Sequence, residues 1–458
     1  MKKLLALLIF ATSIVNAQYS IKGTMVPPDK GDWVILYKIE GPKQKFISNT
    51  TIKTDTAQIG GQKQVIGKFE FQLPKTAKTG VYRATYKNRG NGYVDFYFNK
   101  ENVHFLFNSK NPEETVVFTS SRENKLFQEY LRAYNAIQQR IDELQVSYID
   151  NTSKEIKKSY KKELKTLEET QDFYENKSEG MLVHTFIKAS QHYNSSNPEN
   201  NLRDYLASTA KNFFNFIDFK SEVLFNSPIF VDKINHYLFY LNFSENFETQ
   251  QQLLKGSIKN VVAKIPSGEL KNRTIIYLIN VLTERRNGPL VDWLFENYYN
   301  KLPKEVQDAA FKKETLAILR ATVGRIAPDF SWKENGKNMK LSTLNDGEKY
   351  LLVFWSTRCP HCVKEVPDLY EFMQQNYKEV STVSFGIEND TIGWSEFVKM
   401  LPNWHNAIGT HPENKWDNEI VRTYQLLATP SYFILDKNKK IVAMPEHLED
   451  VKNYFERN

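Results

Sequence analysis

Cysteine is scarce in this chain, with 2 cysteines among 458 residues. So few cysteines cannot hold a chain of this length together, which excludes a disulfide-stapled scaffold. Hydrophobic residues make up 41% and charged residues 25% of the sequence, as in ordinary globular proteins, which excludes disorder as the dominant state. At about 150 residues per domain, the length predicts roughly three domains.

Long hydrophobic runs are missing as well, apart from one at the N-terminus. Lys2 and Lys3 precede the apolar stretch Leu4–Phe10, and small residues follow at Val15–Ala17. About ten apolar residues are too few to cross a bilayer, which needs about 20. The layout is typical of a secretory signal peptide over Met1–Ala17. We therefore expect an exported protein of the periplasm or cell envelope, with no membrane span after cleavage.

A strong excess of one charge sign is also absent, because 61 Lys and Arg against 54 Asp and Glu give a net charge of +7. The densest basic segment, 157–165, alternates charged with apolar residues at helical spacing. This pattern is typical of a solvated helix face rather than a nucleic-acid site. We predict no nucleic-acid partner.

The first region after the signal, residues 18–118, has the pattern of β-structure. Short runs rich in Val, Ile, Phe and Tyr are separated by clusters of Gly, Pro, Asn and Asp, which form turns. The runs are Trp33–Ile39, Lys68–Leu73, Val81–Tyr86, Tyr93–Phe98 and Val103–Phe107. Their spacing predicts a small all-β domain, sandwich-like or barrel-like.

Residues 119–324 change to a helical pattern. Apolar residues recur in steps of three and four along two stretches separated by Asp150–Ser153, which predicts an antiparallel pair of amphipathic helices. The two stripes are Leu126, Tyr130, Ala133, Ile137, Ile141, Leu144 and Tyr148, then Ile156, Tyr160, Leu164, Leu167 and Tyr174. Further helices are predicted around 202–219, 228–243, 269–285, 289–300 and 304–322. We expect an all-α domain that serves as a spacer or docking platform.

Residues 325–458 alternate between strand and helix patterns. We predict strands at Tyr350–Trp355 and Val380–Ile387 on either side of a helix at Pro360–Asn376. Helical material follows around 394–400 and 416–426, and then strands at Ser431–Asp436 and Lys440–Met444 and a helix at 447–456. A βαβ unit followed by a ββα unit is a small α/β fold.

Both cysteines lie within four residues, as Cys359-Pro360-His361-Cys362. A disulfide that closes so short a loop adds about 2 kcal/mol in the chain-entropy model, against nearly 5 for a loop of about 100 residues. A zinc site needs about four ligands, but there is no second cysteine pair and the histidines are scattered. We therefore predict redox chemistry at Cys359 and Cys362, with no metal and no cofactor.

The local pattern explains why the first of these thiols should react. We expect the strand Tyr350–Trp355 to run into a tight turn and a helix to begin at or just after Cys359. The free N–H groups and the positive end of the helix dipole then favour a thiolate there. Pro360 suits the first helical turn because it has no N–H to leave unsatisfied, and His361 adds a positive or hydrogen-bonding group. Cys362, one turn further on, is expected to be the resolving thiol.

The stretch Phe354–Cys362 resembles the active site of the thioredoxin fold. The domain is similar to TlpA/ResA-like extracytoplasmic thiol–disulfide oxidoreductases in four further places, namely Ala327–Phe330 at its start, Glu365, Pro367 and Thr429-Pro430. The resemblance covers about 130 residues. The full arrangement, a β domain, a helical middle and a thioredoxin-like domain, is similar to exported proteins of Bacteroidetes-type bacteria.

This resemblance implies roles for several residues. Glu365 would carry a proton to or from Cys362. A cis bond before Pro430 would let the backbone of Thr429 hydrogen-bond an extended segment of a disulfide-containing protein substrate. Trp355 is interpreted as partly core and partly active-site wall.

Two departures from the resemblance matter. Thioredoxins proper carry a buried aspartate where this chain has Val353, which leaves Glu365 as the acidic relay nearby. Arg358 replaces the tryptophan that usually precedes the first cysteine, and its charge would lower the pKa of Cys359 or select acidic substrates.

The direction of electron flow stays open on the sequence. The Pro-His dipeptide resembles DsbA-type oxidases, whereas the surrounding frame resembles reductive TlpA-like proteins. These extremes differ by roughly 7 kcal/mol in redox free energy. We predict reduction of protein disulfides rather than their oxidation or isomerisation, with an envelope electron donor as partner.

Two other functions stay open. A peroxiredoxin-like peroxidase shares the fold, but it needs a Thr three residues before the reactive cysteine, where this chain has Ser356. In a binding or chaperone-like envelope protein, the β and helical domains would hold the partner and the redox module would be incidental.

Overall fold

The computed structural model of the chain describes residues 17–87, 90, 92–266 and 268–457. The predicted signal peptide Met1–Ala17 lies outside the described residues, except that the backbone of Ala17 begins the first strand. The chain divides into two compact units that meet between Leu270 and Lys271. In the part of the chain that the structure describes, no helix combines the length and the apolar character needed to cross a membrane.

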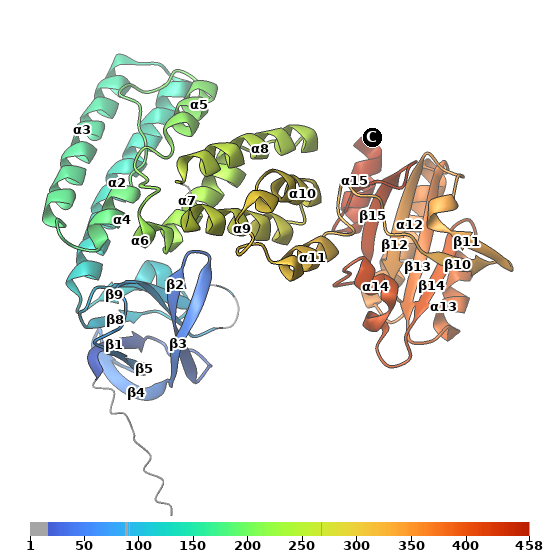
Figure 1. Cartoon of the computed structure of the whole chain (residues 1–458), viewed down its shortest axis with the longest axis horizontal. Coiled ribbons are helices and arrows are strands. Elements are labelled where there is room, and N and C mark those ends of the chain that lie inside the picture. Colours follow the sequence, from blue (N-terminus) through green and yellow to red (C-terminus); the bar gives the residue numbers. More distant parts are fainter. Residues whose placement is uncertain (1–16, 88–89, 91, 267, 458) are drawn as a thin grey trace, which may run out of the picture. The chain divides into compact units, whose positions relative to one another are not determined.

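The first unit starts with two sheets that pack into one core (Figure 1). The strands are β1 (Ala17–Met25), β2 (Trp33–Glu40), β3 (Lys43–Thr51), β4 (Lys53–Ile59), β5 (Gln62–Pro74), β6 (Gly80–Thr85), β7 (Tyr93–Phe98), β8 (Val103–Phe107) and β9 (Val117–Phe118). One sheet has the order β4-β5-β1-β8-β9 and the other β3-β2-β6-β7. Alternate side chains of β7 and β8 point inward, so that Phe96 and Phe105 meet Val34 and Phe69 in the core. The predicted all-β region is confirmed.

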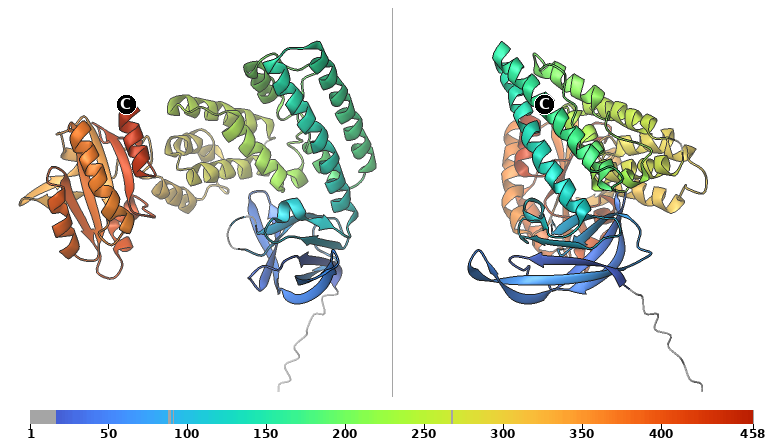
Figure 2. Two further views of the ribbon diagram at one scale, coloured as in Figure 1. Left: turned by 180° about the vertical axis from the view of Figure 1, so that it is seen from behind. Right: turned by 90° about the vertical axis from the view of Figure 1, so that its left-hand side faces the viewer.

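Helices make up the rest of the first unit. They are α1 (Pro112–Thr115), α2 (Arg122–Asp150), α3 (Lys154–Lys177), α4 (Val183–Ala189), α5 (Leu202–Asn212), α6 (Glu222–Phe225), α7 (Pro228–His236), the π-helical turn η1 (Tyr237–Leu241) and α8 (Phe247–Lys264). Figure 2 shows α2 and α3 side by side as the predicted hairpin. Both begin at a serine cap, since the hydroxyls of Ser121 and Ser153 accept from N–H groups of the first turn. Helix α8 was not predicted.

The second unit opens with helices that are shorter than the sequence pattern predicts. They are α9 (Glu269–Glu284), α10 (Gly288–Asn297), the 3-10 turn η2 (Tyr299–Lys301) and α11 (Ala309–Ile318). The predicted helix 304–322 begins only at Ala309, because the carboxylate of Asp308 accepts from the backbone N–H groups of Ala310 and Phe311 and caps the helix there.

The α/β domain completes the second unit. Its elements are β10 (Ser331–Glu334), β11 (Lys337–Lys340), η3 (Leu341–Thr343), β12 (Lys349–Trp355), α12 (Pro360–Asn376), β13 (Val380–Glu388), α13 (Ile392–Phe397), η4 (Val398–Met400), β14 (His405–Thr410), η5 (Lys415–Asp417), α14 (Glu419–Thr423), β15 (Ser431–Asp436), β16 (Ile441–Ala443) and α15 (Leu448–Arg457). The sheet order is β14-β13-β12-β15-β16, with β12, β13 and β14 parallel and β15 antiparallel to β12. The sequence did not predict β10, β11 or β14.

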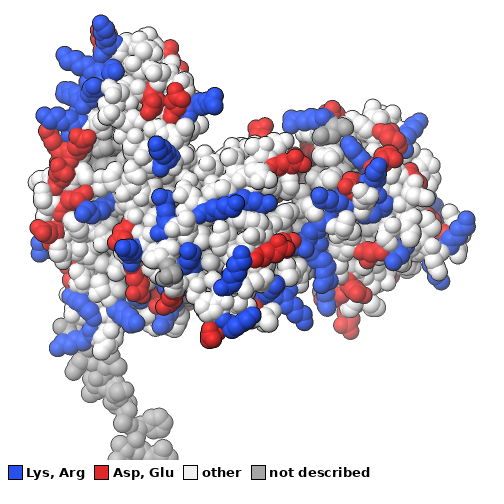
Figure 3. Space-filling model, turned by 45° about the horizontal axis from the view of Figure 1, so that its top comes forward, with Lys and Arg blue, Asp and Glu red and all other residues white. Residues whose placement is uncertain are grey.

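Both faces of this sheet are covered, which places the end of β12 between two cores. Leu351, Val353 and Trp355 pack against α12 and α15, whereas Leu352 and Phe354 pack on the opposite face. A strand buried on both faces reads as a continuous apolar run, which is why β12 was predictable from its sequence. On the face of the molecule that Figure 3 shows, basic and acidic side chains are interspersed.

Candidate functional site

The two cysteines lie at the connection between β12 and α12, where the helix begins. Cys359 is the N-cap of α12, and its sulfur accepts a hydrogen bond from the backbone N–H of Cys362 at 3.3 Å. Pro360 occupies the first turn of the helix, as the sequence predicted. Pro367, one of the residues on which the resemblance rests, lies inside α12. The sulfur of Cys359 therefore sits among the free N–H groups at the positive end of the helix.

The loop before β15 closes over the first sulfur. The Thr429–Pro430 peptide bond is cis, as the resemblance implied. The thiol of Cys359 donates a hydrogen bond to the carbonyl oxygen of Thr429 at 3.2 Å. Cys359 is partly exposed, whereas Cys362 is 0% exposed. The structure thus brings together Cys359, Cys362 and the cis-proline loop, with one sulfur open to solvent and the other enclosed.

The two thiols are shifted in opposite directions. Burial acts to raise the pKa of Cys359, but hydrogen bonds with Cys362 and Thr429 and from the backbone N–H of His361 outweigh it, so the pKa is lowered. Burial first, and then the hydrogen bond with Cys359, raises the pKa of Cys362 to about 12. Because the thiolate is the nucleophile, the two shifts favour Cys359 over Cys362 as the reactive sulfur.

Glu365 lies one turn beyond Cys362 on α12, and the residue is half-buried. Its Oε2 accepts a hydrogen bond at 3.2 Å from the hydroxyl of Tyr432, the second residue of β15. Tyr432 is 2% exposed and belongs to the same core cluster as Cys362. Sequence reasoning missed Tyr432, which reads as an ordinary strand aromatic two residues after Pro430.

A second carboxylate fixes the turn before Cys359, and sequence reasoning missed it too. Glu388, at the end of β13, is 2% exposed. Its Oε1 accepts from the backbone N–H and the hydroxyl of Thr357, and its Oε2 accepts from the hydroxyl of Ser356 at 3.3 Å. The ammonium group of Lys415 donates to the same Ser356 hydroxyl at 2.7 Å. This network holds the backbone that delivers Cys359 to the helix N-terminus.

The remaining predicted site residues surround this centre. Trp355 is 0% exposed and donates through its indole N–H to Ser384 Oγ at 2.8 Å, so it is a core residue at the base of the site. Arg358 is exposed and forms an ion pair with Asp390 at 3.0 Å. Pro360 and His361 are both exposed. Within the described residues, no group of three or more His, Cys, Asp or Glu side chains is placed to hold a metal ion.

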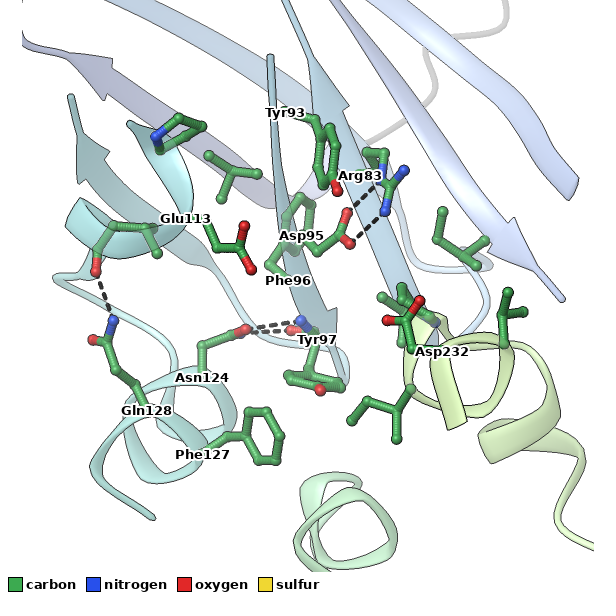
Figure 4. A pocket seen from close by; sticks show the side chains of 18 of the residues that line it. Arg83, Tyr93, Asp95, Phe96, Tyr97, Glu113, Asn124, Phe127, Gln128 and Asp232 are labelled. Atoms are coloured by element: carbon green, nitrogen blue, oxygen red, sulfur yellow. Dashed lines mark hydrogen bonds and ion pairs between the residues drawn. The ribbon is translucent and has the colours of Figure 1, made fainter. Parts of the chain in front are cut away.

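The first unit contains a cavity of about 620 Å³, which Figure 4 shows from close by. It lies between strands β6 and β7 and helices α1, α2 and α7. Arg83 binds both carboxylate oxygens of Asp95, at 2.6 and 2.7 Å, and its guanidinium carbon lies 3.7 Å from the centre of the Tyr93 ring. The carboxylates of Glu113 and Asp232 also line this cavity. This cavity was not predicted from the sequence.

Two solved structures are similar to parts of this chain. A domain of a possible thiol-disulfide isomerase from Cytophaga hutchinsonii is 27% identical and covers 30% of this chain and 91% of its own, with a TM-score of 0.26. A thioredoxin-like protein from Bacteroides caccae is 14% identical and covers 56% of this chain and 93% of its own, with a TM-score of 0.39.

Sequence relatives agree on the class of protein. The Redoxin family model matches residues 322–456. The thiol-disulfide oxidoreductase ResA of Bacillus cereus is 27% identical over 176 residues, which are 38% of this chain and 87% of the relative. ResA of Bacillus thuringiensis subsp. konkukian is 30% identical over 124 residues, which are 26% of this chain and 67% of the relative. Through its C-terminal thioredoxin-like domain, the chain therefore belongs to the ResA-like family of thiol-disulfide oxidoreductases.

Proposed function

We propose that this oxidoreductase is exported and that its Cys359-Pro360-His361-Cys362 segment reduces disulfide bonds in other proteins of the cell envelope. One observation carries the proposal. The sulfur of Cys359 is partly exposed at the N-terminus of α12, 3.2 Å from the carbonyl of Thr429, while Cys362 is enclosed one turn away. These positions support a role for Cys359 as the attacking thiolate at the surface and for Cys362 as the resolving thiol behind it.

The reaction proceeds in two exchanges. The Cys359 thiolate attacks one sulfur of the substrate disulfide, forms a mixed disulfide and releases the other substrate sulfur as a thiolate, which takes a proton from water. Cys362 then loses its proton and attacks the sulfur of Cys359. The Cys359–Cys362 disulfide forms, and the second substrate sulfur leaves as a thiolate and is protonated. The substrate gains two electrons and the cysteine pair loses them.

We assign Glu365 as the group that takes the proton of Cys362 and later returns it. The half-burial of Glu365 next to the core cluster of Cys362 supports this assignment. Thr429 and Pro430 are proposed to bind an extended substrate segment, with backbone groups of the loop as partners. Pro360, His361, Arg358 and Trp355 are proposed to tune the site.

The remaining parts of the proposal concern the cellular setting. Export rests on the N-terminal sequence pattern, and the three segments 18–118, 119–324 and 325–458 are proposed to act as separate domains. The second of them, the helical segment, is proposed to serve as a spacer or docking platform. An envelope electron donor is required in the reductive direction, because each turnover leaves Cys359 and Cys362 oxidised.

The test is reduction of insulin disulfides by the whole mature chain, with dithiothreitol as the electron source. Cys359→Ser should lower the rate at least about 1,000-fold, because no thiolate then begins the exchange. Cys362→Ser is the matched control, and it should still attack and should accumulate a mixed disulfide visible by mass spectrometry. Turnover that persists in Cys359→Ser would overturn the assignment. A reduction potential near −120 mV rather than near −270 mV would overturn the reductive direction.

A further inference from the structure

The enclosed thiol of Cys362 sets a chemical problem for the second exchange. Cys362 is 0% exposed and packs among apolar side chains of the sheet and of α12. Burial of this kind disfavours the thiolate, and it raises the pKa of Cys362 to about 12. Water does not reach the sulfur, so the proton has to pass to a group that the protein itself holds nearby.

Tyr432 links the neighbourhood of that thiol to Glu365. It follows Pro430 on β15, and its ring packs in the core cluster that contains Cys362. Its hydroxyl donates to Glu365 Oε2 at 3.2 Å. Burial, and then the charge of Glu365, raises the pKa of Tyr432, to which the charges of Cys362 and Cys359 also contribute. The titratable groups acting on the phenol are thus Glu365 and the two thiols, and the phenol stays a proton donor throughout the physiological range.

We propose that Tyr432 is a positioning residue for the resolving step, because its hydroxyl holds the Glu365 carboxylate beside the buried thiol of Cys362. The inference rests on the proposed role of Glu365. A glutamate side chain near the start of a helix has three rotatable bonds, and its carboxylate tends to extend into solvent. Holding the carboxylate in one position on the protein side therefore costs side-chain entropy. A charge-assisted hydrogen bond from a rigid, buried phenol fixes one carboxylate oxygen on the protein side.

The step balances without a further reactant. The free Oε1 of the Glu365 carboxylate takes the proton of Cys362, and the Cys362 thiolate attacks the sulfur of Cys359. The bond between Cys359 and the substrate sulfur breaks as the Cys359–Cys362 bond forms. The departing substrate thiolate takes a proton from the Glu365 carboxylic acid or from water. Tyr432 keeps its own proton and only orients the carboxylate.

The experiment separates the two exchanges in time. Reduced whole chain is mixed in a stopped-flow instrument with one equivalent of 5,5′-dithiobis(2-nitrobenzoate), which releases one coloured thiolate when Cys359 attacks and a second when Cys362 resolves. Tyr432→Phe removes one hydroxyl and keeps the ring. We expect the second phase to slow about tenfold at pH 7, the loss that follows from one hydrogen bond to a charged group. Its half-maximal pH should move upward, while the first phase stays within twofold of wild type.

Tyr424→Phe is the matched control. Tyr424 is also buried and also donates through its hydroxyl, to the carbonyl of Pro328, but it belongs to the core on the opposite face of the sheet. We expect both phases of this variant to match wild type. A second phase slowed as much in Tyr424→Phe as in Tyr432→Phe would overturn the inference, because a general loosening of the domain would then explain the effect.

Glu365→Gln separates failure of this inference from failure of the proposed function. We expect it to slow the second phase about 100-fold and to remove the pH dependence that Tyr432→Phe only shifts. If Glu365→Gln resolves at the wild-type rate, the role of Glu365 itself is wrong. If Glu365→Gln is slow but Tyr432→Phe keeps the wild-type rate and pH profile, the positioning role is wrong. Glu365→Asp, which is too short to reach Tyr432, should behave like Tyr432→Phe, and a wild-type rate there would also overturn the inference.

Discussion

Both units hold a polar group next to a strand that helices cover, but the partners of that group differ between the units. In the first unit, the charge of Arg83 is cancelled by both oxygens of Asp95 and covered by the ring of Tyr93. In the second unit, at the end of a helix, the sulfur of Cys359 accepts a hydrogen bond from the backbone N–H of Cys362, and its thiol donates one to the carbonyl oxygen of Thr429; both partners are neutral. A fully paired group has little left to offer a ligand or a reaction, whereas a thiolate held by N–H groups keeps its lone pairs for chemistry.

The comparison also applies within the cysteine pair. The two sulfurs are three residues apart, yet their pKa values move in opposite directions because one lies at a helix end and the other lies in the core. Burial and hydrogen bonding therefore decide how readily a cysteine ionises at each of these two positions.

Selective alkylation tests the contrast between the sulfurs most directly. In the reduced chain at pH 7.5, iodoacetamide should modify Cys359 at least about 100-fold faster than Cys362, because the alkylation rate follows the thiolate fraction and access. The Cys359 rate should rise with pH and reach half its maximum below pH 9.0, the ordinary value for such a thiol, since its pKa is lowered. Peptide mapping by mass spectrometry assigns the label to each sulfur.

Equal labelling of the two cysteines at pH 7.5 would contradict the burial of Cys362. Labelling in 6 M guanidinium chloride provides the control, because both sulfurs should then react at nearly the same rate once the fold is lost. A half-maximal pH above 9.0 for Cys359 in the folded chain would contradict the stabilisation of its thiolate by the backbone N–H groups of Cys362 and His361.

Whether a feature of this site could be predicted depends on how far apart the interacting residues lie along the chain. The cap at Cys359, the place of Pro360 and the proline within α12 follow from neighbouring residues, and all of them could be predicted. The cis bond at Thr429–Pro430 was implied by resemblance alone. Tyr432 and Glu388 escaped because their partners lie 67 and 31 residues away along the chain. Nothing local distinguishes a tyrosine that holds a carboxylate from one that only fills a core.

The fold divides in the same way. Strand β12 could be predicted because it is apolar throughout, and α2 because its buried positions recur at helical spacing. Strands β3 and β4 were not predicted, because most of their residues are polar and exposed and show no strand pattern. Their pairing with β2 and β5 stabilises them as strands. Helix α8 was not predicted because the first half of its sequence is mostly polar, which obscures the helical spacing of its buried residues.

The paired charges of the first unit predict a change in stability without a change in activity. Asp95→Asn leaves the guanidinium of Arg83 half-buried with one weaker partner, which should cost about 1–2 kcal/mol. Hydrogen exchange of β6 and β7 in the whole chain should become about tenfold faster, measured by mass spectrometry. Insulin reduction should stay within twofold of wild type.

Asp55→Asn is the matched control, because Asp55 pairs with Lys68 at 2.6 Å on the exposed surface of the same unit. Exposed pairs contribute little, so exchange of β6 and β7 should not change in this variant. A loss of insulin reduction in Asp95→Asn, with the chain still folded, would show that the cavity takes part in turnover. It would contradict the prediction that the paired charges of the first unit affect stability alone.

Substitution of Arg358 tests whether its charge affects the neighbouring Cys359, although the guanidinium is paired with residues away from the sulfur. The expected effect is small. The guanidinium of Arg358 donates to Asn389 and Asp390 on the loop after β13, and about half of its side chain is exposed. A cation that is solvated and paired acts weakly on a neighbouring thiol. Arg358→Ala should therefore slow the alkylation of Cys359 by no more than about threefold, and Asp390→Asn, which frees the cation, should speed it by a similar factor. A tenfold loss in Arg358→Ala would mean that this charge, rather than the helix end, is what makes the first sulfur reactive.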